Sequence, residues 1–151
     1  KATSESERQR LLADMRSAGV EPNVVTFTTL IEKAASESER QRLLADMRSA
    51  GVEPNVVTFN TLMNKSASLA EVEAYFGRMR EAGIRPNHYS LPALIKACPS
   101  YDAGRRWLES FQTNRFPINE YAFKALRRHA VRDEQRAEIT ALEQSILGRQ
   151  P

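Results

Sequence analysis

The sequence predicts an all-α fold, a right-handed α-solenoid of antiparallel helix-turn-helix repeats. The first observation is that Ser4 to Phe27 recurs without a change as Ser36 to Phe59, an offset of 32 residues. A fixed period of about 20 to 50 residues is the signature of repeat architectures. Three series keep the same phase further along the chain: Gly19, Gly51 and Gly83; Pro22, Pro54 and Pro86; and Leu12, Leu44, Phe76 and Leu108.

The first helix of each repeat is predicted from an apolar stripe. Phe27, Leu30, Ile31 and Ala34 are spaced i, i+3, i+4 and i+7, which places them on one face of a helix. Phe59, Leu91 and Phe123 keep the phase of Phe27 in the later repeats. We therefore predict first helices over residues 24–34, 56–66, 88–98 and 120–130.

The second helices that begin at Ser4, Ser36 and Ser68 open with a capping-box spacing and end at a glycine. Ser36 and Glu39 have the capping-box spacing, and Leu43 and its neighbours supply an apolar face. Gly51 can adopt the left-handed conformation that ends a helix, and a proline three residues later prevents the helix from resuming. The predicted second helices cover residues 4–18, 36–50, 68–82, 100–113 and 132–147.

We predict that the whole chain, residues 1–151, forms a single repeat array. A partial repeat (1–23) precedes three complete repeats (24–55, 56–87 and 88–119) and a divergent terminal repeat (120–151). The terminal repeat has a more polar second helix, as expected of a cap. Because Lys1 lies inside a repeat, we expect the chain to be a piece of a longer array.

Composition excludes several classes of protein. The chain is 41% hydrophobic and 27% charged, which is typical of a folded, soluble domain. No apolar run is long enough to span a membrane. With Cys98 as its only cysteine, the chain can form no internal disulfide, which favours a reducing compartment. The net charge of +3 permits a polyanionic partner without requiring one.

The sequence offers little support for catalysis. His88 and His129 are the only histidines, and no metal-binding, nucleophile or phosphate-loop motif surrounds them. We therefore expect no catalytic residue, no metal, no cofactor and no small-molecule substrate. We also expect Cys98, at the end of a first helix, to be unreactive.

The string GVEPNVVTFNTLM, with a second helix that ends FGRMREAGIRPN, resembles the pentatricopeptide repeat family. The hallmark of that family is V-V-T-Y-N-T-L-I with a closing G-x-x-P-D/N. The segment HYSLPALIKACP, His88 to Pro99, looks like a variant of the same repeat. The resemblance covers nearly the whole chain, although these 32-residue repeats are shorter than the family's usual length.

The resemblance implies binding of single-stranded RNA, with one base per repeat selected by two side chains. One lies on the first turn of the first helix and the other is the last residue of the repeat. Carried over to this chain, the selecting pairs are Thr28 with Asn55, Asn60 with Asn87, and Pro92 with Asn119. The resemblance assigns adenine to the first pair and cytosine or uracil to the second. Pro92 has no donor, so the third step should discriminate weakly, and Lys124 in the terminal repeat is assigned no base.

Neighbouring positions could contribute to such binding. At one phase of the repeat, four side chains could pack against base faces: Val25, Val57, Tyr89 and Tyr121. At the ends of the first helices, four cations could contact phosphates: Lys33, Lys65, Lys96 and Arg128. The alternative for the cations is that the helix dipole favours them at a C-terminus. Family resemblance further implies a role in RNA processing, stability or translation, in an organelle (mitochondrion or plastid) or a bacterial cytoplasm.

Several alternatives remain open from the residues alone. An Asn after Pro is also a good N-cap, which applies to Asn23, Asn55, Asn87 and Asn119. The ESER and RQR runs are expected to be a solvated face, and Trp107 a packing residue. At the level of function, the competing interpretation is a peptide-binding or protein-binding helical scaffold of the tetratricopeptide type.

Overall fold

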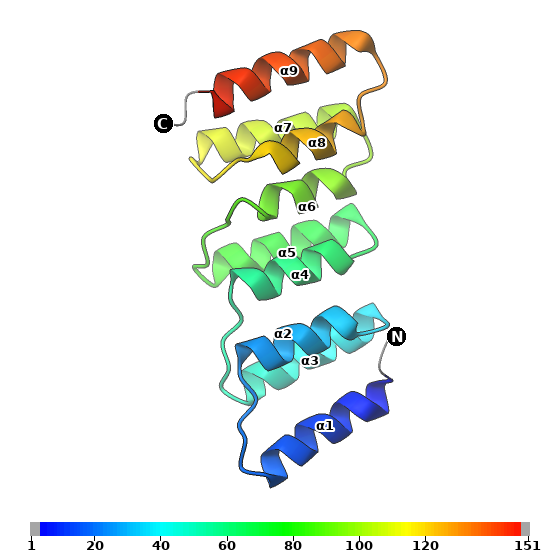
Figure 1. Cartoon of the computed structure of the whole chain (residues 1–151), viewed down its shortest axis with the longest axis vertical. Helices are drawn as coiled ribbons and strands as arrows, with labels where there is room; N and C mark the ends of the chain where they lie inside the picture. The colour runs from blue at the N-terminus through cyan, green and yellow to red at the C-terminus, as the bar shows by residue number, and fades with distance from the viewer. Residues whose placement is uncertain (1–3, 149–151) are drawn as a thin grey trace. The chain divides into compact units, whose positions relative to one another are not determined.

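The structure is a computed structural model that describes residues 4–148. The chain divides into two compact parts, an N-terminal part (Lys1–Ser66) and a C-terminal part (Ala67–Pro151). The described residues form nine α-helices and no strand, which confirms the prediction of an all-α fold (Figure 1).

The N-terminal part holds four helices: α1 (Glu5–Ser17), α2 (Val24–Lys33), α3 (Glu37–Ser49) and α4 (Val56–Lys65). The C-terminal part holds five: α5 (Leu69–Glu81), α6 (Ser90–Ala97), α7 (Tyr101–Thr113), α8 (Glu120–Arg127) and α9 (Asp133–Leu147). Seven of the nine agree with the predicted bounds to within one residue at each end, so the even-numbered helices are the first helices of the repeats.

Two first helices are shorter than predicted, and hydrogen bonds explain both. Helix α6 begins at Ser90 instead of residue 88 because the Asn87 Oδ1 accepts the Tyr89 N–H at 3.0 Å, which forms a turn before the helix. Helix α8 ends at Arg127 instead of residue 130 because the chain tightens into i→i+3 bonds, including Ala130 N–H to the Arg127 carbonyl at 3.2 Å.

The second helices end in a repeated Schellman turn. In α3, the Val52 N–H donates to the Met47 carbonyl at 3.0 Å, and Gly51 adopts φ of 73°. Gly19 and Gly83 do the same after α1 and α5. After α7 the equivalent position is Arg115, with φ of 53° and the same hydrogen bond from the Phe116 N–H to the Phe111 carbonyl at 2.9 Å.

The core of each part forms where first helices pack on first helices and on their own second helices. In the N-terminal part, α2 packs against α3 and α4 (Figure 1), which buries Phe27, Ile31, Met47 and Phe59 completely. In the C-terminal part, α6 packs against α7 and α8, and α8 against α9. Neither helix of a repeat can bury its apolar face alone, so this stacking is what stabilises the fold.

The second helices α5 and α7 meet through aromatic rings. Phe76 packs edge-on against Trp107 at a centroid distance of 5.3 Å and stacks on Phe111 at 5.8 Å. Phe116 continues the cluster at 5.2 Å from Phe111. Trp107 is therefore a packing residue, as predicted.

The expectation of a solvated ESER and RQR face is wrong for three of its residues. Arg8, Glu39 and Arg40 are only 2%, 7% and 8% exposed. Arg8 on α1 forms an ion pair with Glu39 on α3 and donates to the Lys33 carbonyl at 3.3 Å. Arg40 donates to the Lys65 carbonyl, also at 3.3 Å. The i, i+4 pattern could not reveal these bonds because their partners lie 25 or 31 residues away in sequence.

Arg115 generates a testable prediction because it occupies the left-handed position that glycine fills in the other three turns. A non-glycine residue in the left-handed conformation destabilises the folded state by about 1 kcal/mol. Part of the gain from replacing it with glycine is lost, because glycine increases the conformational entropy of the unfolded chain. Arg115→Gly should therefore raise the free energy of unfolding by about 0.5 kcal/mol in urea denaturation. The reverse substitution, Gly83→Ala, should lower it by about 1 kcal/mol. A stability loss in Arg115→Gly would show instead that the arginine side chain stabilises the turn.

Candidate nucleic-acid interface

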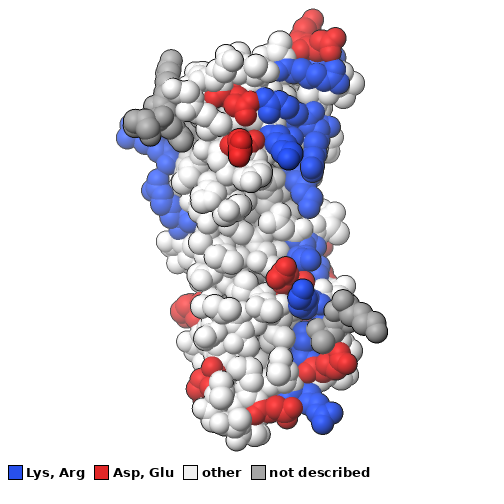
Figure 2. All heavy atoms as spheres, viewed as in Figure 1, with Lys and Arg blue, Asp and Glu red and all other residues white. Residues whose placement is uncertain are grey.

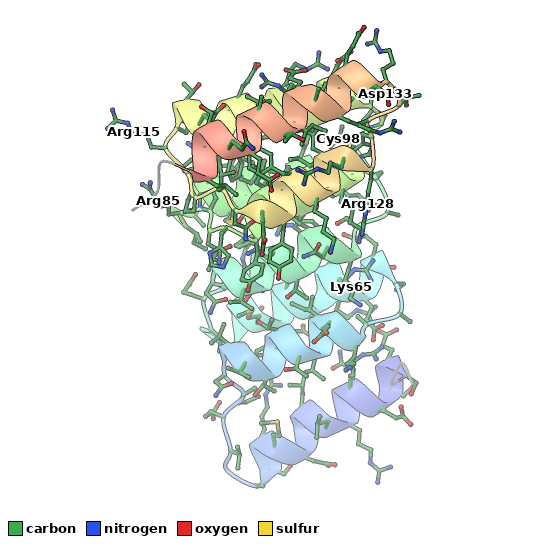
Figure 3. All side chains as sticks on the ribbon, turned by 45° about the horizontal axis from the view of Figure 1, so that its top comes forward. Lys65, Arg85, Cys98, Arg115, Arg128 and Asp133 are labelled. Atoms are coloured by element: carbon green, nitrogen blue, oxygen red, sulfur yellow. The ribbon has the colours of Figure 1, made fainter. Side chains whose placement is uncertain are left out.

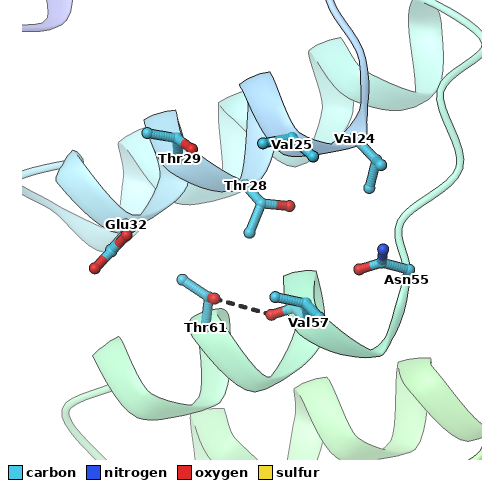
Figure 4. A pocket seen from close by; sticks show the side chains of 8 residues that line it. All are labelled: Val24, Val25, Thr28, Thr29, Glu32, Asn55, Val57 and Thr61. Atoms are coloured by element: carbon cyan, nitrogen blue, oxygen red, sulfur yellow. Dashed lines mark hydrogen bonds between the residues drawn. The ribbon is translucent and has the colours of Figure 1, made fainter.

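A pocket of about 290 Å³ lies between α2 and α4 in the N-terminal part (Figure 4). Eight side chains line it: Val24, Val25, Thr28, Thr29, Glu32, Asn55, Val57 and Thr61. The set includes both members of the first predicted selecting pair, Thr28 and Asn55, and both valines predicted to pack on bases. The structure thus brings together, in one open concavity, predicted site residues from two separate segments of the chain.

The two members of this pair are joined through a third residue, Thr58. The Thr28 and Thr58 hydroxyl oxygens lie 2.9 Å apart, and the Thr58 hydroxyl donates to Asn55 Oδ1 at 3.2 Å. Thr58 is fully buried on the first turn of α4. The sequence analysis missed this residue, although a hydroxyl recurs at its register in Thr26 and Ser90.

Asn55 is an N-cap as well as a pocket residue. Its Oδ1 accepts the Thr58 N–H at 3.1 Å, and the Thr58 hydroxyl accepts the Asn55 N–H at 3.3 Å, which completes a reciprocal capping box. Asn23 and Thr26 make the same box at the start of α2. The N-cap interpretation is confirmed at these two positions, and it leaves the amide nitrogen of Asn55 available to a ligand.

The second predicted pair is divided between the two parts of the chain. Asn60 lies on α4 in the N-terminal part, where it is buried, and Asn87 precedes α6 in the C-terminal part. The pair therefore remains a prediction.

The third pair lies within the C-terminal part and differs from the first. Pro92 is on the first turn of α6, and Asn119 precedes α8 without making a side-chain cap bond. Among the described residues, Asn119 Oδ1 is buried with no hydrogen-bond partner. The N–H of Ala122, three positions later, donates to the Asn119 main-chain carbonyl at 3.1 Å, and Ala122 has no hydroxyl where α2 and α4 have threonine. The N-cap interpretation is wrong at Asn119.

Tyr89 and Tyr121 present the surfaces that the stacking prediction requires. Their side chains are 54% and 50% exposed, which is unusual for large aromatic residues in a packed helical fold. The Tyr89 ring also lies 4.3 Å from the His88 ring, measured between centroids. An exposed aromatic ring can stack on any base, and each such stack contributes about 1 to 3 kcal/mol.

The four predicted phosphate contacts are exposed at the ends of the first helices, and within residues 4–148 none of them forms an ion pair. They fall into two registers of the repeat. Lys33 and Lys65 share one, whereas Lys96 and Arg128 share the register of Glu32 and Asn64. One residue turns a helix by about 100°, so these cations do not form a single column.

In the C-terminal part, Lys and Arg side chains gather where α6 and α8 end (Figure 2). Arg128 marks that end of α8, and Arg85 and Arg115 lie together at the opposite end (Figure 3), where Arg85 donates to the Arg115 carbonyl at 2.7 Å. Cations therefore lie near both ends of α6 and α8, next to the predicted selecting residues Pro92 and Asn119.

Nothing in the described part of the chain suggests a metal centre, since no group of three or more His, Cys, Asp or Glu side chains could hold an ion there. Burial raises the pKa of the Cys98 thiol to about 11, so the thiolate that would react as a nucleophile is scarce at neutral pH. In the same described region, no helix is long and apolar enough to cross a membrane.

Comparison with known families and structures supports the repeat assignment. Residues 10–68 match the model of the pentatricopeptide repeat domain family. No curated protein sequence matches the chain.

Solved structures share the fold at low sequence identity. One is the pentatricopeptide repeat protein PPR10 in complex with an 18-nt psaJ RNA element, with a TM-score of 0.73 and 24% identity over 89% of this chain. The chain spans 21% of that PPR10 chain, and PPR10 from maize matches similarly, with a TM-score of 0.71.

Another is the PPR domain of Arabidopsis thaliana protein-only RNase P 1 in complex with tRNA. It has a TM-score of 0.69 and 17% identity, over 96% of this chain and 82% of that one. These similarities confirm the predicted α-solenoid class.

The contrast between Asn23 and Asn119 yields a second prediction. Asn23→Ala removes a working cap and should lower the free energy of unfolding by about 1 kcal/mol. Asn119→Ala removes a buried carbonyl that has no partner, so stability should stay the same or rise, by up to about 1 kcal/mol. Chemical denaturation of both variants checks this, and an equal loss in the two would mean that Asn119 does cap α8.

Proposed function

We propose that this chain, whose residues 10–68 match the pentatricopeptide repeat domain family, binds single-stranded RNA along its first helices, with one base read by each repeat. The observation that carries the proposal is the pocket between α2 and α4. It gathers a hydroxyl, an amide and two exposed valines around a space open to solvent. PPR10 in complex with an 18-nt RNA element and the RNase P domain in complex with tRNA support RNA as the ligand.

The family resemblance supplies the base proposed for each step. We assign adenine to Thr28 with Asn55 and cytosine or uracil to Asn60 with Asn87, while Pro92 with Asn119 discriminates weakly. Val25, Val57, Tyr89 and Tyr121 would pack on base faces, and Lys33, Lys65, Lys96 and Arg128 would contact phosphates. The consequence of binding that we propose is RNA processing, stability or translation, in an organelle or a bacterial cytoplasm.

Binding to RNA should be weak and sensitive to salt. With about 1 to 3 kcal/mol per stacked base, offset by the entropy lost on association, we expect micromolar or weaker affinity. If all four predicted cations neutralise phosphates, log K should fall with log salt with a slope of about −3. Fluorescence anisotropy with labelled RNA oligomers at several salt concentrations measures both. Binding of a peptide in the absence of any RNA binding would favour the tetratricopeptide-like alternative.

The residue assignment has its own test. Thr28→Asn converts the first pair into the kind found at the second, Asn with Asn. The preferred base at that step should then change from adenine to a pyrimidine, as read by selection from a random RNA pool. The matched control is Thr113→Asn at the C-terminal end of α7, outside the pocket, which should leave the preference as it was. An unchanged preference in Thr28→Asn would refute the assignment even if RNA binds.

A further inference from the structure

Thr58 joins the two predicted selecting residues of the first step through a chain of hydrogen bonds. Its hydroxyl lies 2.9 Å from the Thr28 hydroxyl and 3.2 Å from Asn55 Oδ1, and it accepts the Asn55 N–H at 3.3 Å. Thr58 is fully buried, so water does not compete for these bonds. All three residues lie in the N-terminal part, on or next to α2 and α4.

The direction of each proton in this chain is determined. Asn55 Oδ1 can only accept, and its orientation is fixed because it also takes the Thr58 N–H at 3.1 Å. The single proton of the Thr58 hydroxyl therefore points to Asn55. The bond between the two threonines must then run the other way, with Thr28 as the donor.

The pocket consequently presents hydrogen-bond acceptors and donors to a ligand at defined positions. The Thr28 proton is directed inward, so its oxygen offers lone pairs to the pocket. Thr61 behaves likewise because its hydroxyl donates to the Val57 carbonyl at 2.8 Å, and the Glu32 carboxylate only accepts. The donors that remain are the two N–H groups of the Asn55 amide and the hydroxyl of Thr29, the residue after Thr28 on α2.

We propose that Thr58 is a specificity-determining residue: by fixing Thr28 as an acceptor and Asn55 as a donor, it selects bases with an amino group beside a ring-nitrogen acceptor. The inference rests on the proposed RNA binding. Adenine and cytosine have that arrangement on their Watson–Crick edges. Guanine and uracil present a carbonyl oxygen beside a ring N–H, which would set acceptor against acceptor and donor against donor. The mismatch should weaken binding about 5- to 100-fold.

The chain contains a matched control for this role. Thr26 makes the same capping box with Asn23, with Thr26 N–H to Asn23 Oδ1 at 3.0 Å and the hydroxyl to Oδ1 at 3.1 Å. The helix before α2 is α1, which is a second helix. Thr26 therefore has no threonine on a preceding first helix that could bond to it as Thr28 bonds to Thr58. Thr26→Val and Thr58→Val therefore remove the same hydroxyl bonds of the capping box and keep its N–H bond to Oδ1, but only Thr58→Val removes the bond to Thr28.

The experiment selects RNA from a random pool with the full chain and with the Thr58→Val, Thr58→Ser and Thr26→Val variants. The base position read by this step is the one whose preference changes in Thr28→Asn. At that position the wild type should favour adenine and cytosine over guanine and uracil about tenfold or more. In Thr58→Val the ratio should fall to within about threefold, because the Thr28 hydroxyl can then rotate and donate. Thr58→Ser and Thr26→Val should keep the wild-type ratio.

The outcomes distinguish a failure of this inference from a failure of the proposed RNA binding. No binding of any RNA by the wild type overturns the proposed function and this inference together. Binding by a folded Thr58→Val protein with the wild-type preference overturns this inference alone. If Thr58→Val does not fold, as judged by circular dichroism, Thr28→Val replaces it. That variant removes the acceptor itself and should likewise lose the preference, and a retained preference would again refute the role.

Discussion

The first helices of the repeats are the elements that present the candidate site, and they are short. Helices α2 and α4 have 10 residues each, and α6 and α8 have 8. Helices of fewer than about 12 residues are marginal in water, so their ends must be stabilised from outside. In the N-terminal part, the Asn–Thr boxes hold the N-termini of α2 and α4. Arg8 and Arg40, reaching from α1 and α3, bind the carbonyls of Lys33 and Lys65 at their C-termini.

This arrangement links stability to the candidate function at Asn55, the residue that caps the N-terminus of α4. Asn55 uses its amide oxygen to hold α4 and keeps its amide nitrogen for the pocket, so one side chain serves both purposes without conflict. The price is that a substitution at Asn55 changes helix stability and base recognition together. Thr28 is the cleaner position, because it lies inside α2 and caps nothing.

Features that recur in each repeat could be predicted from the sequence, whereas contacts between neighbouring repeats could not. The period, the capping boxes and the turn at Gly51 are local patterns, and they fixed most helix bounds to within one residue. The buried Arg8 with Glu39, and the bond from Thr28 to Thr58, join residues 31 and 30 positions apart. No helical period relates such residues, so their burial depends on how neighbouring repeats stack. The family resemblance supplied the candidate pairs, yet it could not show that Asn119 lacks a cap.

The hydroxyl register shows how the repeats can differ in specificity while the fold stays the same. Thr26, Thr58, Ser90 and Ala122 occupy one position of successive repeats. At Thr58 the hydroxyl and the N–H both donate to Asn55 Oδ1, so the Asn55 amide is held in one orientation with its N–H groups directed away from Thr58. Where the hydroxyl is absent, at Ala122, Asn119 Oδ1 is buried without a partner in the described region and the amide is not oriented by a cap. Since Pro92 also lacks a donor, both halves of that step are poorly defined. Under the proposed function, the step at Thr28 and Asn55 would discriminate between bases, whereas the step at Pro92 and Asn119 would mainly continue the stack of repeats.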